Sequence, residues 1–197
     1  MAHELDIGRD DVISMVERSP ENLEERIARV EAKEAIHDLM MRYGHFSDAR
    51  DTEGVLALYT EDVERVLIGT LDERVQGKET LRELYRNPIL PTKDGRTLGE
   101  ASRYKRDRKT TIRHMFAAPL IRLTDSGSEG WLTSYFTLVR SVTSTEGFER
   151  HVHEGTYTFT FVHLEEGWRI KKMIVDTEIG HDHGYNPTAE QSEANSS

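Results

Sequence analysis

The sequence predicts a single α+β domain in which helices come first and a curved antiparallel sheet follows. Apolar residues recur at intervals of three and four between residues 23 and 43, which is typical of an amphipathic helix. The second half of the chain is rich in β-branched and aromatic residues, in segments separated by turn signals. Helices and strands that are segregated in this way are typical of α+β folds.

Composition restricts the class of protein. The chain has 197 residues, of which 36% are hydrophobic and 31% charged, as expected for one soluble domain. A net charge of -10 argues against nucleic acid or an anionic membrane as a partner. The absence of cysteine excludes disulfides and thiolate metal sites. Because there is no apolar run of about 20 residues and no signal-peptide pattern, we expect a cytoplasmic protein.

The first elements are an arm and a long helix. Residues 1–19 carry a weak helical pattern, and we expect an arm that packs on the body or on a neighbouring molecule. Ser19-Pro20 favours a helix start, because Ser can cap a helix and Pro is tolerated in its first turn. Gly44 and Ser47-Asp48 should end this helix. Its apolar stripe consists of Leu23, Ile27, Val30, Ile36, Leu39, Met40 and Tyr43.

Shorter elements follow. Asp51 is a plausible N-cap for a second helix, residues 63–68 favour a strand, and Gly77 opens a third helix. Residues 86–109 lack periodicity and predict a long loop, of the kind that often serves as a lid or binding loop.

The second half predicts an antiparallel meander of four strands, after which the tail is polar. A long helix laid across such a bent sheet leaves a cone-shaped cavity lined by the helix end and by inward-facing strand residues. We expect one domain over residues 20–184 and a disordered tail over 185–197. The four strand segments are 111–123, 130–145, 151–164 and 167–179.

Three residues point to chemistry. His114 lies in an apolar stretch that favours a strand, and Tyr43 and Asp48 lie at the end of the long helix. A His and an Asp brought together in an apolar pocket form a general acid/base pair that needs no cofactor. Structural roles are the alternatives: Asp48 satisfying backbone amides at the helix end, His114 as a hydrogen-bonded core residue, and Tyr43 as packing.

Seven short motifs occur in a fixed order along the chain. They are Glu34–Tyr43, Asp48–Asp51, Leu58–Val63, Gly77–Glu79, Arg113–Met115, Gly155–Tyr157 and Gly167–Ile170. Together they resemble SnoaL-like proteins of the NTF2-like superfamily, over about residues 30–178. The resemblance implies an NTF2-like (cystatin-like) cone-shaped barrel, in which a curved antiparallel sheet wraps around a long N-terminal helix. It also implies a homo-oligomer, either a dimer or a trimer.

The pattern is most similar to the branch of scytalone dehydratase and hexachlorocyclohexane dehydrochlorinase, which work without metal. The resemblance implies that Asp48 and His114 form the base pair, and that Tyr43 orients substrate or water. The dehydratase has a second His on its sheet, whereas this chain has Ser141 or a neighbour there. His151 or His153 on the next strand could substitute.

These features predict a cofactor-independent lyase with a small aromatic substrate. The expected reaction is an acid/base elimination on a hydroxylated, lignin-type compound, by dehydration or by formaldehyde-releasing C–C cleavage. One alternative is an isomerase of the ketosteroid isomerase type that uses the same His and Asp. The other is a non-enzymatic small-molecule binding or assembly module, since this fold hosts many functions.

Other residues are candidates for binding the substrate. Tyr59, Phe116 and Tyr135 would serve as cavity wall or as core. His153 could be a second acid/base or binding group. Arg106, in the basic stretch 103–109, and Arg113 could hold a carboxylate or phenolate at the pocket mouth, although a solvated loop explains them equally well. His151, His153, His181 and His183 make a metal site conceivable, but we expect none.

Overall fold

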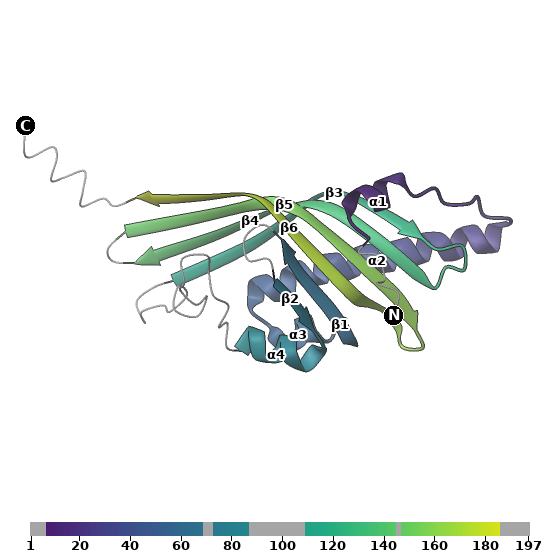
Figure 1. The fold of residues 1–197 in the computed structure, drawn as a ribbon, viewed down its shortest axis with the longest axis horizontal. Helices are drawn as coiled ribbons and strands as arrows, with labels where there is room; N and C mark the ends of the chain where they lie inside the picture. The colour runs from purple at the N-terminus through teal and green to yellow at the C-terminus, as the bar shows by residue number, and fades with distance from the viewer. Residues whose placement is uncertain (1–6, 69–72, 87–108, 145–146, 186–197) are drawn as a thin grey trace, which may run out of the picture.

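The computed structural model describes residues 7–68, 73–86, 109–144 and 147–185, which fold as helices followed by one six-stranded sheet (Figure 1). The predicted loop and tail, residues 87–108 and 186–197, lie outside the described residues. Within the described part of the chain, no helix is long and apolar enough to cross a membrane. The helices are α1 (Arg9–Ser14), α2 (Leu23–Ala49), α3 (Thr52–Leu56) and α4 (Lys78–Arg86). The strands are β1 (Tyr59–Ile68), β2 (Glu73–Gln76), β3 (Lys109–Leu123), β4 (Glu129–Ser144), β5 (Gly147–Leu164) and β6 (Gly167–Tyr185).

The sheet is mixed, in the order β2-β1-β6-β5-β4-β3. Strands β3 to β6 form the predicted antiparallel meander. The prediction of a wholly antiparallel sheet needs correction, because β1 joins β6 in parallel, with Val66 opposite Ile174. Strand β2, which was not predicted, pairs antiparallel with β1 and has only four residues, too few for an alternation to show.

The ends of α2 differ from the prediction by several residues. The Asn22 side chain accepts a hydrogen bond from the Glu25 backbone N–H at 2.9 Å, so the helix begins at Leu23. Gly44 does not end it; α2 continues to Ala49, and Arg50 caps it in a left-handed conformation with φ 57°. Asp51 caps α3, as predicted. Asp48 consequently lies in the last turn of α2.

Only the second half of α2 packs against the core. Ile36, Leu39, Met40 and Tyr43 are buried beneath the sheet. The apolar stripe of the first half does not face the core, because a different side of the helix faces β3 there. That side carries Arg29, which is 9% exposed and donates to the Thr124 carbonyl at 3.3 Å. The three apolar residues of the first half, Leu23, Ile27 and Val30, are 69%, 49% and 61% exposed.

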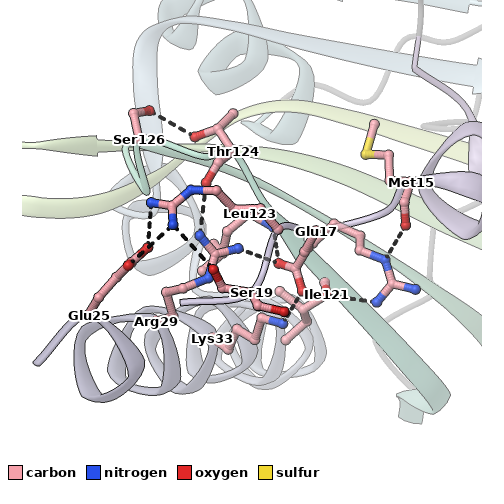
Figure 2. A network of polar contacts seen from close by, with 12 residues as sticks. Met15, Glu17, Ser19, Glu25, Arg29, Lys33, Ile121, Leu123, Thr124 and Ser126 are labelled. Carbon is pink, nitrogen blue, oxygen red and sulfur yellow. Dashed lines mark hydrogen bonds and ion pairs between the residues drawn. The ribbon is translucent and has the colours of Figure 1, made fainter. Parts of the chain in front are cut away.

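Glu17 ties the N-terminal arm to both α2 and β3 (Figure 2). Its carboxylate accepts from the Leu123 backbone N–H at 2.7 Å, from Arg29 at 3.2 Å and from Lys33 at 2.5 Å. Burial raises the pKa of Glu17, but these donors and their charges outweigh burial and hold the pKa below its usual value. The ionised carboxylate thus joins three segments that are far apart in the sequence.

Helix α1 packs on the opposite face of the sheet from α2 (Figure 1). Val12 is fully buried there, and the Arg9 guanidinium donates to the Tyr135 hydroxyl at 2.6 Å. Phe136, the next residue on β4, is buried in the core on the α2 side, as the alternation of side chains along a strand requires. The arm therefore covers part of the outer face.

A bulge at Gly155 bends β5. The register of β5 against β6 shifts between Glu154 and Gly155. A Cβ atom on Gly155 would lie 1.9 Å from the carbonyl oxygen of Asp176, so only glycine fits. The bend lies between His153 and Tyr157, two residues of the pocket described below.

We predict that Glu17→Gln destabilises the protein by about 1–3 kcal/mol, because it leaves Arg29 and Lys33 without a counter-charge. Urea unfolding at neutral pH measures this free energy. Glu21→Gln is the control: that side chain is 80% exposed, and its loss should cost less than about 0.5 kcal/mol. Equal effects of the two substitutions would show that Glu17 does not anchor the arm.

Candidate functional site

Asp48 and His114 form a pair between the end of α2 and strand β3. Oδ1 of Asp48 lies 2.8 Å from Nδ1 of His114. The same carboxylate accepts from the backbone N–H of His114, at 3.0 Å to Oδ1 and 3.3 Å to Oδ2. The side chains are 14% and 9% exposed, so this pair is largely withdrawn from solvent.

The position of β3 in the sheet makes this double contact possible. Because β3 is an edge strand, backbone N–H groups that point away from β4 have no partner within the sheet. Asp48 satisfies the one that belongs to His114. Gly44, one turn earlier on α2, allows the close approach, since a Cβ there would lie 2.8 Å from Cε2 of Phe116 and 3.6 Å from Cβ of His114.

The geometry assigns a tautomer to His114. A carboxylate only accepts hydrogen bonds, so Nδ1 of the neutral ring carries the proton and Nε2 keeps a lone pair. None of the described residues forms a hydrogen bond with Nε2. Burial lowers the pKa of His114, Asp48 raises it and Arg65 lowers it, and the net pKa is below the usual value. At neutral pH the ring is therefore an uncharged base.

Two phenols adjoin the imidazole. The rings of Tyr43 and His114 meet edge to face at 5.9 Å, and Tyr157 lies at the same distance from Tyr43. Burial raises the pKa of Tyr157 to about 12 and that of Tyr43 well above its usual value. Both phenols therefore remain protonated and can act as hydrogen-bond donors.

His114 opens onto a cavity of about 260 Å³. Side chains from α2, from α4 and from every strand except β2 line this cavity, and most of them are apolar. Its volume is just below the range of roughly 300–1,000 Å³ of drug-sized ligand sites, which suits a small ligand. The lining residues are Tyr43, Ser47, Arg65, Leu67, Ile68, Tyr85, His114, Phe136, Leu138, His153, Tyr157, Val175 and Thr177.

His153 brings a second imidazole to the pocket. Leu138 on β4 is opposite His114 on one side and His153 on the other, so the two His share a face of the sheet, about 10 Å apart. Ser141 pairs with Thr111 and is an odd number of residues from Leu138, which places it on the other face. His153, rather than a residue at Ser141, lies where it can face His114 across the pocket.

Other predicted site residues lie elsewhere. Phe116 stacks on the face of the His114 ring, with 6.2 Å between the ring centres, and is not among the residues that line the cavity. Tyr59 is 1% exposed in the core, where its hydroxyl contacts Sδ of Met173 at 3.7 Å, and it does not line the pocket. Arg106 lies outside the described residues.

Arg113 and Tyr135 are also corrections to the predicted site. They are the neighbours of His114 and Phe136 on β3 and β4, and alternation sends them to the opposite face. Arg113 is exposed and contacts the carbonyl of Ile112, while Tyr135 contacts α1. Neither can contact a ligand beside His114.

Three polar residues of the pocket, Ser47, Arg65 and Tyr85, were not predicted from the sequence. A signal was present for Arg65. It lies on the same face of β1 as Val63 and Leu67, both on the core side, so it is a charged residue at an inward position of a strand. Ser47 and Tyr85 carry no comparable signal, because polar and aromatic residues are common at helix ends.

Metal-binding groups do not gather in the described part of the chain, where no three His, Asp or Glu side chains lie close enough to hold an ion. The side chains of His181 and His183 are not among those described.

A second hollow, of about 270 Å³, lies away from His114. Charged residues of β1 and β6 line it, and two of them pair with one another, Lys172 with Glu64 at 2.8 Å. It contains no residue of the His114 pair, so the smaller cavity beside His114 is the candidate site.

The chain was compared with curated proteins, solved structures and protein-family models. Curated proteins give no match. Among solved structures, a protein from Novosphingobium aromaticivorans proposed to be a scytalone dehydratase has 18% identity, with 82% of this chain and 96% of that one covered and a TM-score of 0.59. A hexachlorocyclohexane dehydrochlorinase from Novosphingobium barchaimii has 15% identity, coverage of 80% and 94%, and a TM-score of 0.58.

A third structure, a proposed aromatic ring hydroxylase from Novosphingobium aromaticivorans, has 20% identity, coverage of 79% and 94%, and a TM-score of 0.57. Similarity at these identities shows the fold, which is the cystatin-like, NTF2-like fold expected from the sequence. The family model of the SnoaL-like domain matches residues 28–174. The chain therefore belongs to the SnoaL-like family of the NTF2-like superfamily.

Proposed function

We propose that the protein is a cofactor-independent lyase that catalyses an acid/base elimination on a small hydroxylated aromatic compound. The observation that carries the proposal is the His114–Asp48 pair beside the pocket. Asp48 fixes the imidazole so that Nε2 is available as a base, and burial keeps the ring neutral at neutral pH. Aromatic rings around it provide the wall that an aromatic substrate would contact.

Dehydration is the simplest reaction for this geometry. Nε2 of His114 removes a proton from carbon, the electron pair forms a C=C bond, and the C–O bond of the neighbouring hydroxyl breaks. Tyr43 or His153 donates the proton that converts the departing hydroxide to water. Asp48 stabilises the imidazolium formed in this step. The proton on Nε2 of His114 then returns to the group that protonated the hydroxide, Tyr43 or His153.

Formaldehyde release from an aryl-propane alcohol is a variant that uses the same residues. Here Nε2 of His114 takes the proton of a primary hydroxyl, and the C–C bond to that carbon breaks to give formaldehyde. A phenolate on the substrate ring first expels the benzylic hydroxyl to give a quinone methide, and the electron pair of the breaking C–C bond then forms the C=C bond and restores the aromatic ring. The departing group again leaves as water, with the proton donated by Tyr43 or His153.

The names of two structurally similar proteins, a proposed scytalone dehydratase and a dehydrochlorinase, denote eliminations and support this class of reaction. A specific observation favours one alternative, an isomerase. The protonated phenols of Tyr43 and Tyr157 beside a neutral base could stabilise an enolate while His114 moves a proton. A purely binding or assembly role is less well supported, because the cavity reaches His114 and is not filled by side chains.

We predict that His114→Asn lowers turnover by roughly 10²–10⁴-fold and that Asp48→Asn lowers it by roughly 10²-fold or more, because the first removes the base and the second its orientation. The assay is mass spectrometry of products from a panel of aryl alcohols and aryl-propane diols, with metal-free protein and no added cofactor. Loss of water or formaldehyde identifies the bond that breaks.

His163→Asn is the matched control, since that imidazole is exposed and contacts Trp168 instead of the pocket. It should retain wild-type turnover. Retained turnover in a folded His114→Asn protein would contradict the proposed base. A product of unchanged mass would favour the isomerase.

The same pair predicts how stability depends on pH. The folded pKa of His114 is below the unfolded value of about 6.5, so the unfolded chain binds the proton more readily. The contribution of His114 is fully present above about pH 6.5 and is lost as pH falls toward the folded pKa, by up to about 1.4 kcal/mol per pH unit. Urea unfolding of wild type between about pH 7.5 and 5.5 should therefore show a steeper loss of stability than His114→Asn. Identical slopes would rule out a depressed pKa.

A further inference from the structure

Three polar atoms in the wall of the His114 pocket have no hydrogen-bond partner among the described residues. They are Oγ of Ser47, Nε of Arg65 and the hydroxyl of Tyr85, and all three are buried. They come from α2, β1 and α4, so three separate elements converge on one place. In the described part of the chain eight buried side-chain atoms are unsatisfied in this way, and these three share one cavity.

Arg65 is the charged member of this group. Its guanidinium carbon lies 5.8 Å from the centre of the Tyr85 ring, and none of the described carboxylates forms an ion pair with it. Burial lowers the pKa of Arg65, but the net pKa remains above its usual value. The side chain is therefore a cation at every physiological pH.

Arg65 is half-buried, and a cation that is partly withdrawn from water is costly without a counter-charge. The charge of Arg65 also acts on its neighbours, because its contribution to the pKa values of His114, Tyr43 and Tyr157 is to lower them. An anion in the cavity would supply the missing counter-charge and would offset this positive potential. The pocket is thus electrostatically incomplete without a ligand.

We infer that Ser47, Arg65 and Tyr85 form a subsite for a carboxylate of the substrate. A guanidinium presents its donors in a planar fork that matches the two oxygens of a carboxylate. The two hydroxyls add further donors, and a carboxylate has about four lone-pair positions to accept them. The three residues have no other described use for these donors.

The subsite narrows the substrate class to a hydroxylated aromatic acid. The carboxylate follows from the subsite, and the hydroxylated aromatic part rests on the proposed function. The carboxylate would be held at Arg65 while the reacting carbon faces Nε2 of His114. Binding would also offset the positive potential of Arg65 at the imidazole. His114 would then become a stronger base when substrate is bound than in the empty pocket.

Binding of benzoate and of benzamide to the full-length protein, measured by calorimetry, tests the subsite. The two compounds are nearly isosteric and differ in charge. Wild type should bind benzoate at least about tenfold more tightly than benzamide, which is typical of one charge-assisted pairing. Arg65→Met should abolish this preference, and Arg65→Lys should retain part of it because the charge remains without the fork. Arg113→Met, which removes the same charge from the outer face of β3, should keep the full preference.

Circular dichroism and the unfolding midpoint confirm that each variant is folded. If Arg65→Met does not fold, Ser47→Ala and Tyr85→Phe replace it, each lowering benzoate affinity by roughly threefold to tenfold and leaving benzamide unaffected. Equal affinity of wild type for the two compounds, or a preference that persists in Arg65→Met, overturns the subsite.

The subsite and the proposed reaction fail separately. His114→Asn should lose turnover and keep the benzoate preference. A benzoate preference that depends on Arg65, in a protein with no lyase activity on any aromatic acid, would overturn the reaction and leave the subsite standing. Lyase activity on aromatic acids that is unchanged in Arg65→Met, in both kcat and KM, would overturn the subsite and leave the reaction standing.

Discussion

The carboxylate of Asp48 accepts both N–H groups that His114 can offer, from the backbone and from Nδ1. The first contact ties the last turn of α2 to an edge strand and satisfies an amide that the sheet leaves unpaired. The second fixes the plane and tautomer of the ring. A structural role for Asp48 therefore does not exclude the chemical role that we propose, because the same carboxylate makes both contacts. The rest of the pocket is built around this junction.

Two basic side chains of the pocket, His114 and Arg65, differ in whether a carboxylate lies beside them. His114 has its own carboxylate, so the pair is balanced when the ring takes up a proton. Arg65 has no such partner among the described residues. The pocket thus contains a base, His114, and a cation without a described counter-charge, Arg65. This combination favours a ligand that carries a negative charge. The phenols of Tyr43 and Tyr157, protonated because they are buried, add donors without adding charge.

The sequence predicted the parts of the fold that depend on local pattern. The meander β3–β6 follows from alternation and turn signals, and the cap at Asp51 follows from side-chain chemistry. The place of His114 and Asp48 came from a family resemblance, and tertiary contact then determined their geometry. The burial of α2 was predicted only in part, because an apolar stripe shows which residues share a face but not how far the sheet extends beneath them.

The candidate binding residues show the same division. Arg113 and Tyr135 were chosen for their chemistry, yet each is one position from an inward residue, and alternation of a strand sends neighbours to opposite faces. The structure instead brings Arg65 to the pocket, from a strand whose place beside β6 depends on a long-range parallel pairing. Such a pairing has no local sequence signal, so the alternation along β1 could indicate an inward charge at Arg65 but not the pocket that it enters.

The central claim is that Asp48 holds His114 as a neutral ring with its proton on Nδ1. Long-range ¹H–¹⁵N correlation spectra of the imidazole at neutral pH measure this directly, since protonated and unprotonated ring nitrogens resonate in separate ranges. We predict a protonated Nδ1 and a lone pair on Nε2, with the assignment made by loss of the signals in His114→Asn. A proton on Nε2, or a doubly protonated ring at neutral pH, would contradict the account, because His114 could then not act as the base.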